Sequence, residues 1–269
     1  MFRTLLIATS LACISFTAKA HEFWIDPVDH ILSPGEPVVA DIRVGEAYEG
    51  TAFAYIPQRF RRFDYALNGE IRPVDGTVGD RPALAMEVAD EGLFVAIHVT
   101  DDQHITWSTW EKFVSFLEHK DLSWGLAEHD ARGLSRENVR ERYSRYAKSL
   151  IAVGEGAGED VTAGLLTEIV ALENPYTDDM SDGLDIRAEY QGDPLKNVQI
   201  EVFRKASDGT VTITLERTDE QGQATIPIEP GARYMLDTVV LRPLEVVEAR
   251  DPPWETLWAN LTFEVPLPN

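Results

Sequence analysis

The sequence has little cysteine and little positive charge. Its 269 residues include one cysteine, and 24 lysines and arginines stand against 46 aspartates and glutamates, which gives a formal net charge of −22. This negative charge repels a phosphate backbone at long range, so the composition argues against binding to nucleic acid or to an anionic membrane surface. The sequence also lacks a nucleophile elbow, a P-loop, a dinucleotide fingerprint and an H-E-x-x-H pair. No common class of enzyme is therefore indicated, and no organic cofactor is expected.

Apolar residues, in contrast, are plentiful. They make up 44% of the chain, aromatic residues make up 9%, and only 26% of the residues are charged. This composition is typical of a globular protein rather than of a disordered acidic tail. The length allows one large domain or two domains of ordinary size.

Residues 1–20 have the pattern of a secretory signal peptide. Arg3 precedes an apolar run from Leu5 to Phe16, which is too short to span a bilayer, and Ala18-Lys19-Ala20 has the small residues of a cleavage site. We expect cleavage after Ala20, a periplasmic protein, and no transmembrane segment in the mature chain. Cys13 raises the alternative of a lipoprotein, but the residue three positions before it is serine, where a bulky aliphatic residue is expected.

Cleavage would change two features of the chain. The single cysteine, Cys13, would be lost, so no disulfide could stabilise the exported protein. Arg3 and Lys19 would also be lost, leaving 22 basic against 46 acidic residues, a net charge of −24.

The expected mature N-terminus is His21, which is a candidate metal ligand. A free α-amine and an imidazole on the same residue can form a chelate ring with Cu²⁺, Ni²⁺, Co²⁺ or Zn²⁺. The amine titrates near about pH 8 and the imidazole near about pH 6.5, so both nitrogens become available around neutrality. The aromatic and apolar residues that follow favour an edge strand over a frayed end.

Short strands separated by turns are predicted in the first part of the mature chain, and they favour an antiparallel β-sandwich. Asn68-Gly69 is a hairpin signal. The predicted strands are Pro37 to Val44, Thr51 to Ile56, Phe63 to Leu67, Ile71 to Val74, Leu84 to Val88 and Phe94 to Val99.

A helical insertion is predicted over residues 110–149, because the apolar spacing changes there. Phe113, Phe116 and Leu117 have helical spacing, and so have Val139, Tyr143, Tyr146 and Leu150, with Ser135 as N-cap and Gly154 beyond the end. The second half of the insertion is rich in arginine. We interpret this positive charge as pairing with acidic groups of the same protein rather than as a docking face for a partner.

After two turn-rich acidic segments, strand patterns resume and predict a second sandwich of immunoglobulin-like size. Its predicted strands are Leu184 to Tyr190, Val198 to Arg204, Val211 to Thr218, Ala224 to Ile228, Tyr234 to Leu241 and Leu257 to Val265. The predicted fold is therefore mainly β. It has an N-terminal sandwich over 21–160 carrying the helical insertion, and an immunoglobulin-like or transthyretin-like sandwich over 161–269.

Several segments resemble one family of proteins. They are His21 to Pro27, Gly35 to Val38, Arg43 to Glu46, Arg140 to Lys148, and Trp254 to Phe263. In this order they resemble the bacterial exported domain-of-unknown-function 4198 family, whose members are commonly labelled periplasmic components of cobalt or nickel uptake. The resemblance implies handling of a divalent metal ion beside an envelope transport system. Among the residues with metal chemistry, only His21 lies inside a matching motif.

Two functions of different classes follow from the sequence. The first is a periplasmic protein that binds nickel, cobalt or copper through His21 and assists metal uptake or handling. The alternative is a non-enzymatic envelope module that binds a protein or a glycan, with His21 incidental. That alternative predicts an exposed aromatic patch near the domain junction. Core packing is the expected role of most of the tryptophans Trp107, Trp110, Trp124, Trp254 and Trp258.

A third hypothesis is a copper-brace oxidase, in which the amine and imidazole of His21 and a second imidazole hold copper. The histidines available as the second ligand are His98, His104, His119 and His129. The distance from His21 to each of these imidazoles would test this hypothesis, and each of them is more commonly solvated or packed in a core than bound to a metal.

Overall fold

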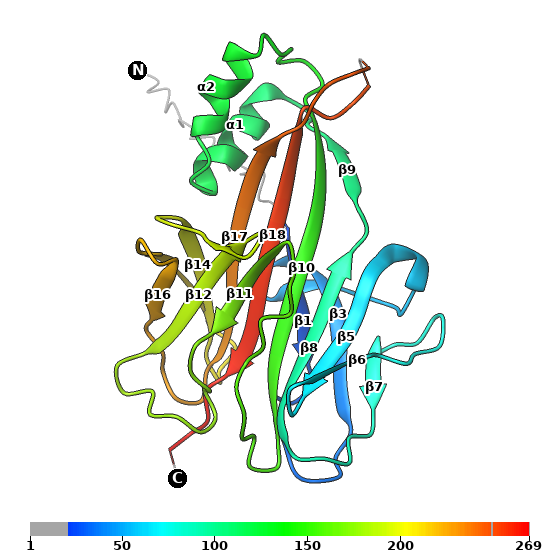
Figure 1. Ribbon diagram of the computed structural model, residues 1–269, viewed down its shortest axis with the longest axis vertical. Coiled ribbons are helices and arrows are strands. Elements are labelled where there is room, and N and C mark those ends of the chain that lie inside the picture. The colour runs from blue at the N-terminus through cyan, green and yellow to red at the C-terminus, as the bar shows by residue number, and fades with distance from the viewer. Residues whose placement is uncertain (1–20, 249, 269) are drawn as a thin grey trace, which may run out of the picture.

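Strands dominate the computed structural model, which describes residues 21–248 and 250–268 (Figure 1). The predicted signal peptide and Cys13 lie outside the described residues. A small sheet contains β1 (Glu22–Pro27), β3 (Val38–Glu46) and β4 (Glu49–Phe53) in that order, with β7 (Leu84–Met86) paired to β3. A third sheet contains β11 (Thr167–Ala171), β12 (Leu184–Tyr190) and β13 (Asp193–Pro194), with β16 (Gln223–Ile226) paired to β12.

The largest sheet has ten strands and joins the two halves of the chain. Its order is β15 (Val211–Arg217), β14 (Gln199–Lys205), β17 (Arg233–Pro243), β18 (Trp254–Glu264), β10 (Arg140–Val153), β8 (Gly92–Thr100), β5 (Phe60–Leu67) and β6 (Glu70–Pro73). Two short strands, β2 (Ile31–Leu32) and β9 (Gln103–Thr106), also pair with β10. The mainly β prediction is confirmed, and the layered sheets are consistent with a sandwich.

The predicted insertion over 110–149 is helical only in its first part. Within the described residues, helix is limited to α1 (Trp110–His119), α2 (Trp124–Ala131) and the single turn η1 (Pro57–Arg59). In Figure 1 both α-helices lie at one end of the long strands β17, β18 and β10. There Phe113, Phe116 and Leu117 of α1 are buried in one cluster with Trp254 and Trp258, and Leu126 of α2 packs against that cluster.

The predicted helix from Ser135 to Leu150 is wrong, because residues 140–153 form the central strand β10. This strand lies between β18, with which it pairs in parallel, and β8, with which it pairs antiparallel. Both of its faces are covered, so its apolar residues do not alternate as they do in a half-exposed strand. The spacing of Tyr143, Tyr146 and Leu150 therefore matched a helix by coincidence.

Part of the positive charge of this segment is paired within the protein, as expected from the sequence. Arg142 forms an ion pair with Glu255 at 2.8 Å. Lys148 is buried, and its Nζ lies 2.8 Å from Asp160 and 3.1 Å from Glu168. Because Glu255 lies on the neighbouring β18, the Arg142 ion pair adds to the backbone pairing between β10 and β18.

Core packing also crosses the predicted boundary at residue 160. One apolar cluster contains Val95 and Ile97 of β8 together with Ile186, Leu261 and Phe263 from the second half of the chain. A second cluster lies between the small sheet and β5, β8 and β10. The division into two sandwich domains remains a prediction, and the large sheet and the first cluster include residues from both predicted parts.

Candidate functional site

His21 lies immediately before an ordered edge strand. β1 pairs with β3 over its whole length, from Glu22 opposite Gly45 to Pro27 opposite Ala40. The His21 carbonyl accepts a hydrogen bond from Nη2 of Arg145 at 3.3 Å, while the imidazole is exposed. The predicted edge strand is confirmed, and the histidine is held on the sheet at this position.

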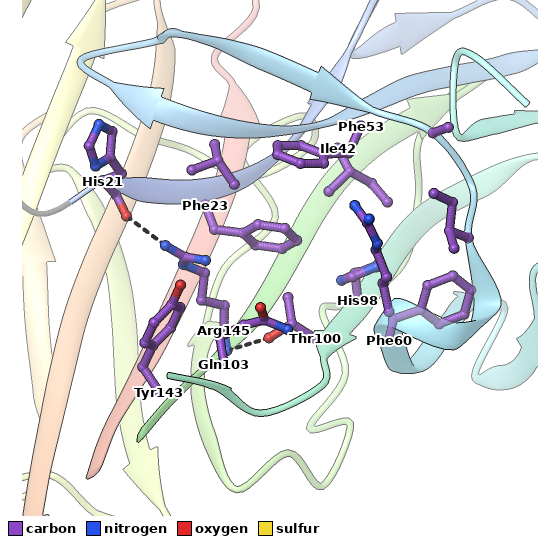
Figure 2. A pocket seen from close by; sticks show the side chains of 14 residues that line it. His21, Phe23, Ile42, Phe53, Phe60, His98, Thr100, Gln103, Tyr143 and Arg145 are labelled. Carbon is purple, nitrogen blue, oxygen red and sulfur yellow. Dashed lines mark hydrogen bonds between the residues drawn. The ribbon is translucent and has the colours of Figure 1, made fainter. Parts of the chain in front are cut away.

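A cavity of about 540 Å³ opens beside His21 (Figure 2). We call it the His98 cavity after the buried histidine in its wall. Strands β1, β3, β4, β5, β8, β9 and β10 and the turn η1 contribute side chains to its lining. The lining residues are His21, Phe23, Ile42, Val44, Phe53, Ala54, Ile56, Arg59, Phe60, His98, Thr100, Gln103, Tyr143 and Arg145.

His98 is surrounded by aromatic rings. The centroid of its imidazole lies 5.2 Å from that of Phe23, 5.1 Å from that of Phe60 and 5.0 Å from that of Phe63. Burial lowers the pKa of His98 to about 3, so the ring is neutral at physiological pH. Its Nδ1 is buried and has no hydrogen-bond partner among the residues that the structure describes.

Arg145 forms the opposite part of the cavity wall and lies against two aromatic rings. The guanidinium carbon is 4.7 Å from the ring centroid of Tyr143 and 5.9 Å from that of Phe23. Burial lowers the pKa of Arg145, yet a guanidinium remains charged in proteins. Its Nε is buried without a hydrogen-bond partner in the described chain, and it forms no ion pair with a described carboxylate.

A second cavity of about 370 Å³, the Glu141 cavity, shares His21, Tyr143 and Arg145 with the first. Glu141 accepts hydrogen bonds from Nε1 of Trp107 at 2.9 Å and from the hydroxyl of Thr256. Burial raises the pKa of Glu141 to about 7, and the two hydrogen bonds oppose this effect only in part. Glu141 therefore titrates near neutrality inside the molecule.

Buried acidic groups lie on the other side of β1. Burial raises the pKa of Glu22 to about 7 and that of Asp237 to about 6, with Lys120 opposing both shifts. Nζ of Lys120 lies 3.2 Å from Asp237 and also bonds to Glu201. The lysine ammonium thus occupies the position between these carboxylates that a cation would take.

The remaining histidines do not line either cavity. His30 is buried and bonds through Nδ1 to the Leu150 carbonyl at 3.0 Å. His129 contacts Nε1 of Trp254 at 3.0 Å, and His119 lies 2.9 Å from Glu201. His104 is exposed on β9. Of the sequence-predicted copper-brace candidates, only His98 borders the same cavity as His21.

His21 and His98 do not face each other. In Figure 2 the His21 imidazole points away from the cavity, and Phe23 lies between the two histidines. Within 21–248 and 250–268, no group of three or more histidine, cysteine, aspartate and glutamate side chains is placed to hold a metal ion. A copper brace requires a second imidazole close to that of His21, and His98 is not in that position.

Four of the five tryptophans named from the sequence pack between the helices and the large sheet, as expected. Trp254 and Trp258 are buried in the same cluster as Phe113 and Phe116, and Trp107 and Trp110 pack against that cluster. Trp124 is the exception, with half of its surface exposed.

Sequence reasoning missed the two arginines of the His98 cavity. Arg145 was noticed only as part of an arginine-rich segment, and Arg59 follows a proline in a short turn. That segment was interpreted as a helix, because β10 shows no alternation of apolar and polar residues. No local pattern indicates that Arg59 and Arg145 line one cavity, since 86 positions separate them.

The fold and the cavities define a mainly β protein. Its ligand-sized cavities lie beside β1, and the His98 cavity is lined by strands of both the small sheet and the ten-stranded sheet. The chain belongs to the family described as "Domain of unknown function (DUF4198)", whose model matches residues 18–242. No curated protein matches the chain. In the described part of the chain, no helix is long and apolar enough to cross a membrane.

One solved structure to which the chain is similar is a tetra-tandem repeat in the extending region of a large adhesion protein. The identity is 11% and the TM-score is 0.21, with 91% of this chain and 50% of that chain covered. The chain therefore spans about half the length of that structure.

Proposed function

We propose that this protein is an exported, periplasmic binding protein that captures a divalent transition metal ion, namely nickel, cobalt or copper. The α-amine and imidazole of His21 would bind the ion after residues 1–20 are removed. The metal is cargo here, and an envelope transport system is the proposed recipient.

The way His21 is held is the observation that supports this proposal most. Arg145 bonds to its carbonyl, and the next residue already pairs with β3. Little backbone freedom is left to lose when a chelate ring closes, which favours binding. The imidazole is exposed and turned toward solvent, so an incoming ion can reach it.

The number of donor atoms also fits a carrier. His21 supplies two nitrogen donors, which leaves the other coordination positions of the ion to water or to ligands of a recipient protein. An ion held in this way can be passed on by ligand exchange. A closed site of four protein ligands, as in structural zinc sites, would retain it.

Metal titration of two matched proteins tests the proposal. One protein begins at His21, and the other carries a single additional alanine before it. We expect the first to bind Ni²⁺, Co²⁺ or Cu²⁺ near one equivalent in isothermal titration calorimetry. The extension moves the amine away from the imidazole and should weaken binding by more than about tenfold, since even second-shell changes typically cost 10–100-fold.

Two controls make the result specific. Circular dichroism should show the same fold for both proteins. A His104→Ala variant, which removes an exposed imidazole on β9, should keep the full affinity. Equal binding by the native and extended proteins would reject the proposal and favour the envelope module in which His21 is incidental.

A further inference from the structure

Two arginines of the His98 cavity lack the carboxylate partners that neighbouring arginines have. Arg61 pairs with Asp102 at 3.2 Å, and Arg142 pairs with Glu255 at 2.8 Å. In the described residues neither Arg59 nor Arg145 forms an ion pair, although the chain has 46 acidic residues. Asp237 and Glu141 act on Arg145 only at longer range, without an ion pair. Two guanidinium groups without a directly paired carboxylate in the described chain thus line one hollow, and such a hollow attracts anions.

The rest of the cavity wall is suited to an apolar group. Phe23, Ile42, Phe53 and Phe60 line it, and Phe23 and Phe60 also contact His98. A volume of about 540 Å³ lies within the range of small-molecule sites, which are mostly apolar with a few polar groups. A free inorganic anion would leave this apolar surface unused.

Two residues of the cavity lining carry a hydrogen-bonding atom without a partner in the described part of the chain. Nδ1 of His98 and Nε of Arg145 are both buried, and neither has a partner among the residues described. Buried polar atoms are normally hydrogen-bonded, since leaving one unpaired costs about 1–3 kcal/mol. Two such atoms in the wall of one cavity point to a ligand with polar atoms.

We propose that the His98 cavity binds a small organic carboxylate with an aromatic or otherwise apolar body. The carboxylate lies against the guanidinium of Arg145 or Arg59, and the apolar body lies among the phenyl rings of Phe23 and Phe60. His98 provides a neutral hydrogen-bonding group in the wall. The carboxylate site does not use the His21 imidazole, which points away from the cavity, although Arg145 also bonds to the His21 carbonyl.

The proposal is tested with 3-phenylpropionate and 4-phenylbutyrate, each compared with its primary amide. The protein beginning at His21 is studied with an excess of EDTA, so that the result does not depend on metal binding. Heteronuclear NMR follows the titration at millimolar ligand. We expect at least one acid to bind with shift changes at the His98 ring and at residues of the cavity. The matching amide should bind at least about tenfold more weakly, because a charge-assisted hydrogen bond is lost.

Substitutions of arginine locate the anion. Arg145→Gln or Arg59→Gln should weaken acid binding by about 10- to 100-fold while leaving the weak amide binding unchanged. Arg72→Gln is the matched control, because Arg72 is exposed on the β6 hairpin and lies outside the cavity. Arg59 lines the cavity and is exposed, so the Arg59→Gln variant remains informative if Arg145→Gln does not fold.

Three results would overturn the proposal. The first is that neither acid binds to the wild-type protein at millimolar concentration. The second is that each acid and its amide bind equally well. The third is that both arginine variants fold and keep the affinity of the Arg72→Gln control. Because EDTA is present throughout, any of these results leaves the metal proposal to be decided by its own titration.

Discussion

Several ionisable side chains in this protein are buried, and their hydrogen bonds and charged neighbours offset the loss of hydration only in part. Glu141 shows how this shifts a pKa. Two donors, Trp107 and Thr256, bond to its carboxylate, but burial raises its pKa from 4.5 to about 7. A raised carboxyl pKa means that the folded state holds a proton that the unfolded chain releases. Protonation of Glu141 therefore contributes to the free energy of unfolding. This contribution is fully present below about pH 4.5 and is lost as the pH rises through about 7.

Replacing Glu141 by glutamine should remove this dependence on pH. Relative to wild type, Glu141→Gln should gain up to about 3 kcal/mol in unfolding free energy between pH 4.5 and pH 8, since one pKa unit corresponds to about 1.4 kcal/mol. Urea unfolding at several pH values measures the difference. His30 and His98, whose lowered pKa values of about 3 act in the opposite direction, are present in both proteins and cancel.

Glu137→Gln is the control for this experiment, because Glu137 is an exposed residue in the loop before β10. Its unfolding free energy should differ from wild type by a nearly constant amount over the same pH range. If Glu141→Gln behaved in the same way, the raised pKa assigned to Glu141 would be wrong.

Among the elements, the hairpin of β3 and β4 holds His21 in place. Gly45 of β3 pairs with Glu22 on one side and with Gly50 on the other. A Cβ atom at Gly45 would lie 1.9 Å from the carbonyl oxygen of Glu49, which is part of the backbone. Glycine at this position therefore allows the close approach of β4 to β3.

Gly45→Ala should destabilise the protein by about 1–3 kcal/mol, because the backbone of the hairpin must shift to admit a methyl group. The midpoint of urea unfolding measures the loss. Thr51→Ala, on the exposed part of β4, is the matched control and should change the midpoint little. Equal midpoints for the two variants would show that the hairpin accommodates the methyl group without strain.

At the scale of the whole molecule, β10 links the parts of the chain that the sequence predicted as separate domains. It pairs in parallel with β18 from Glu141 opposite Trp254 to Ser149 opposite Thr262. Lys148 of β10 also binds Asp160 and Glu168, which belong to the connection and to β11. The backbone pairing, the ion pair of Lys148 with Glu168 and the shared apolar cluster all join the two parts.

We therefore expect the protein to unfold in a single transition. Near-ultraviolet circular dichroism and tryptophan fluorescence should give coincident urea curves. A fragment of residues 161–269 should show no cooperative transition, because β18 would lose its partner and the apolar cluster would lose Val95, Ile97 and Leu150. A fragment that unfolded cooperatively would instead support the two separate domains predicted from the sequence.

The sequence by itself determined the features that depend on local chemistry. Strand propensity and turn residues located most strands, and for β12 the predicted and observed bounds agree. The apolar residues after His21 predicted β1. The family resemblance was confirmed by the match over residues 18–242. These features were predictable because neighbouring residues in the chain carry the signal.

Only the tertiary structure decided the identity of β10 and the position of the cavities. A strand covered on both faces has no period-two pattern, so the arginine-rich segment was indistinguishable from a helix. Arg59, His98 and Arg145 come from three separate elements, and pairing across the sheets brings them to one cavity. Long-range packing places these three side chains in one cavity, and no local sequence pattern indicates that they lie close together.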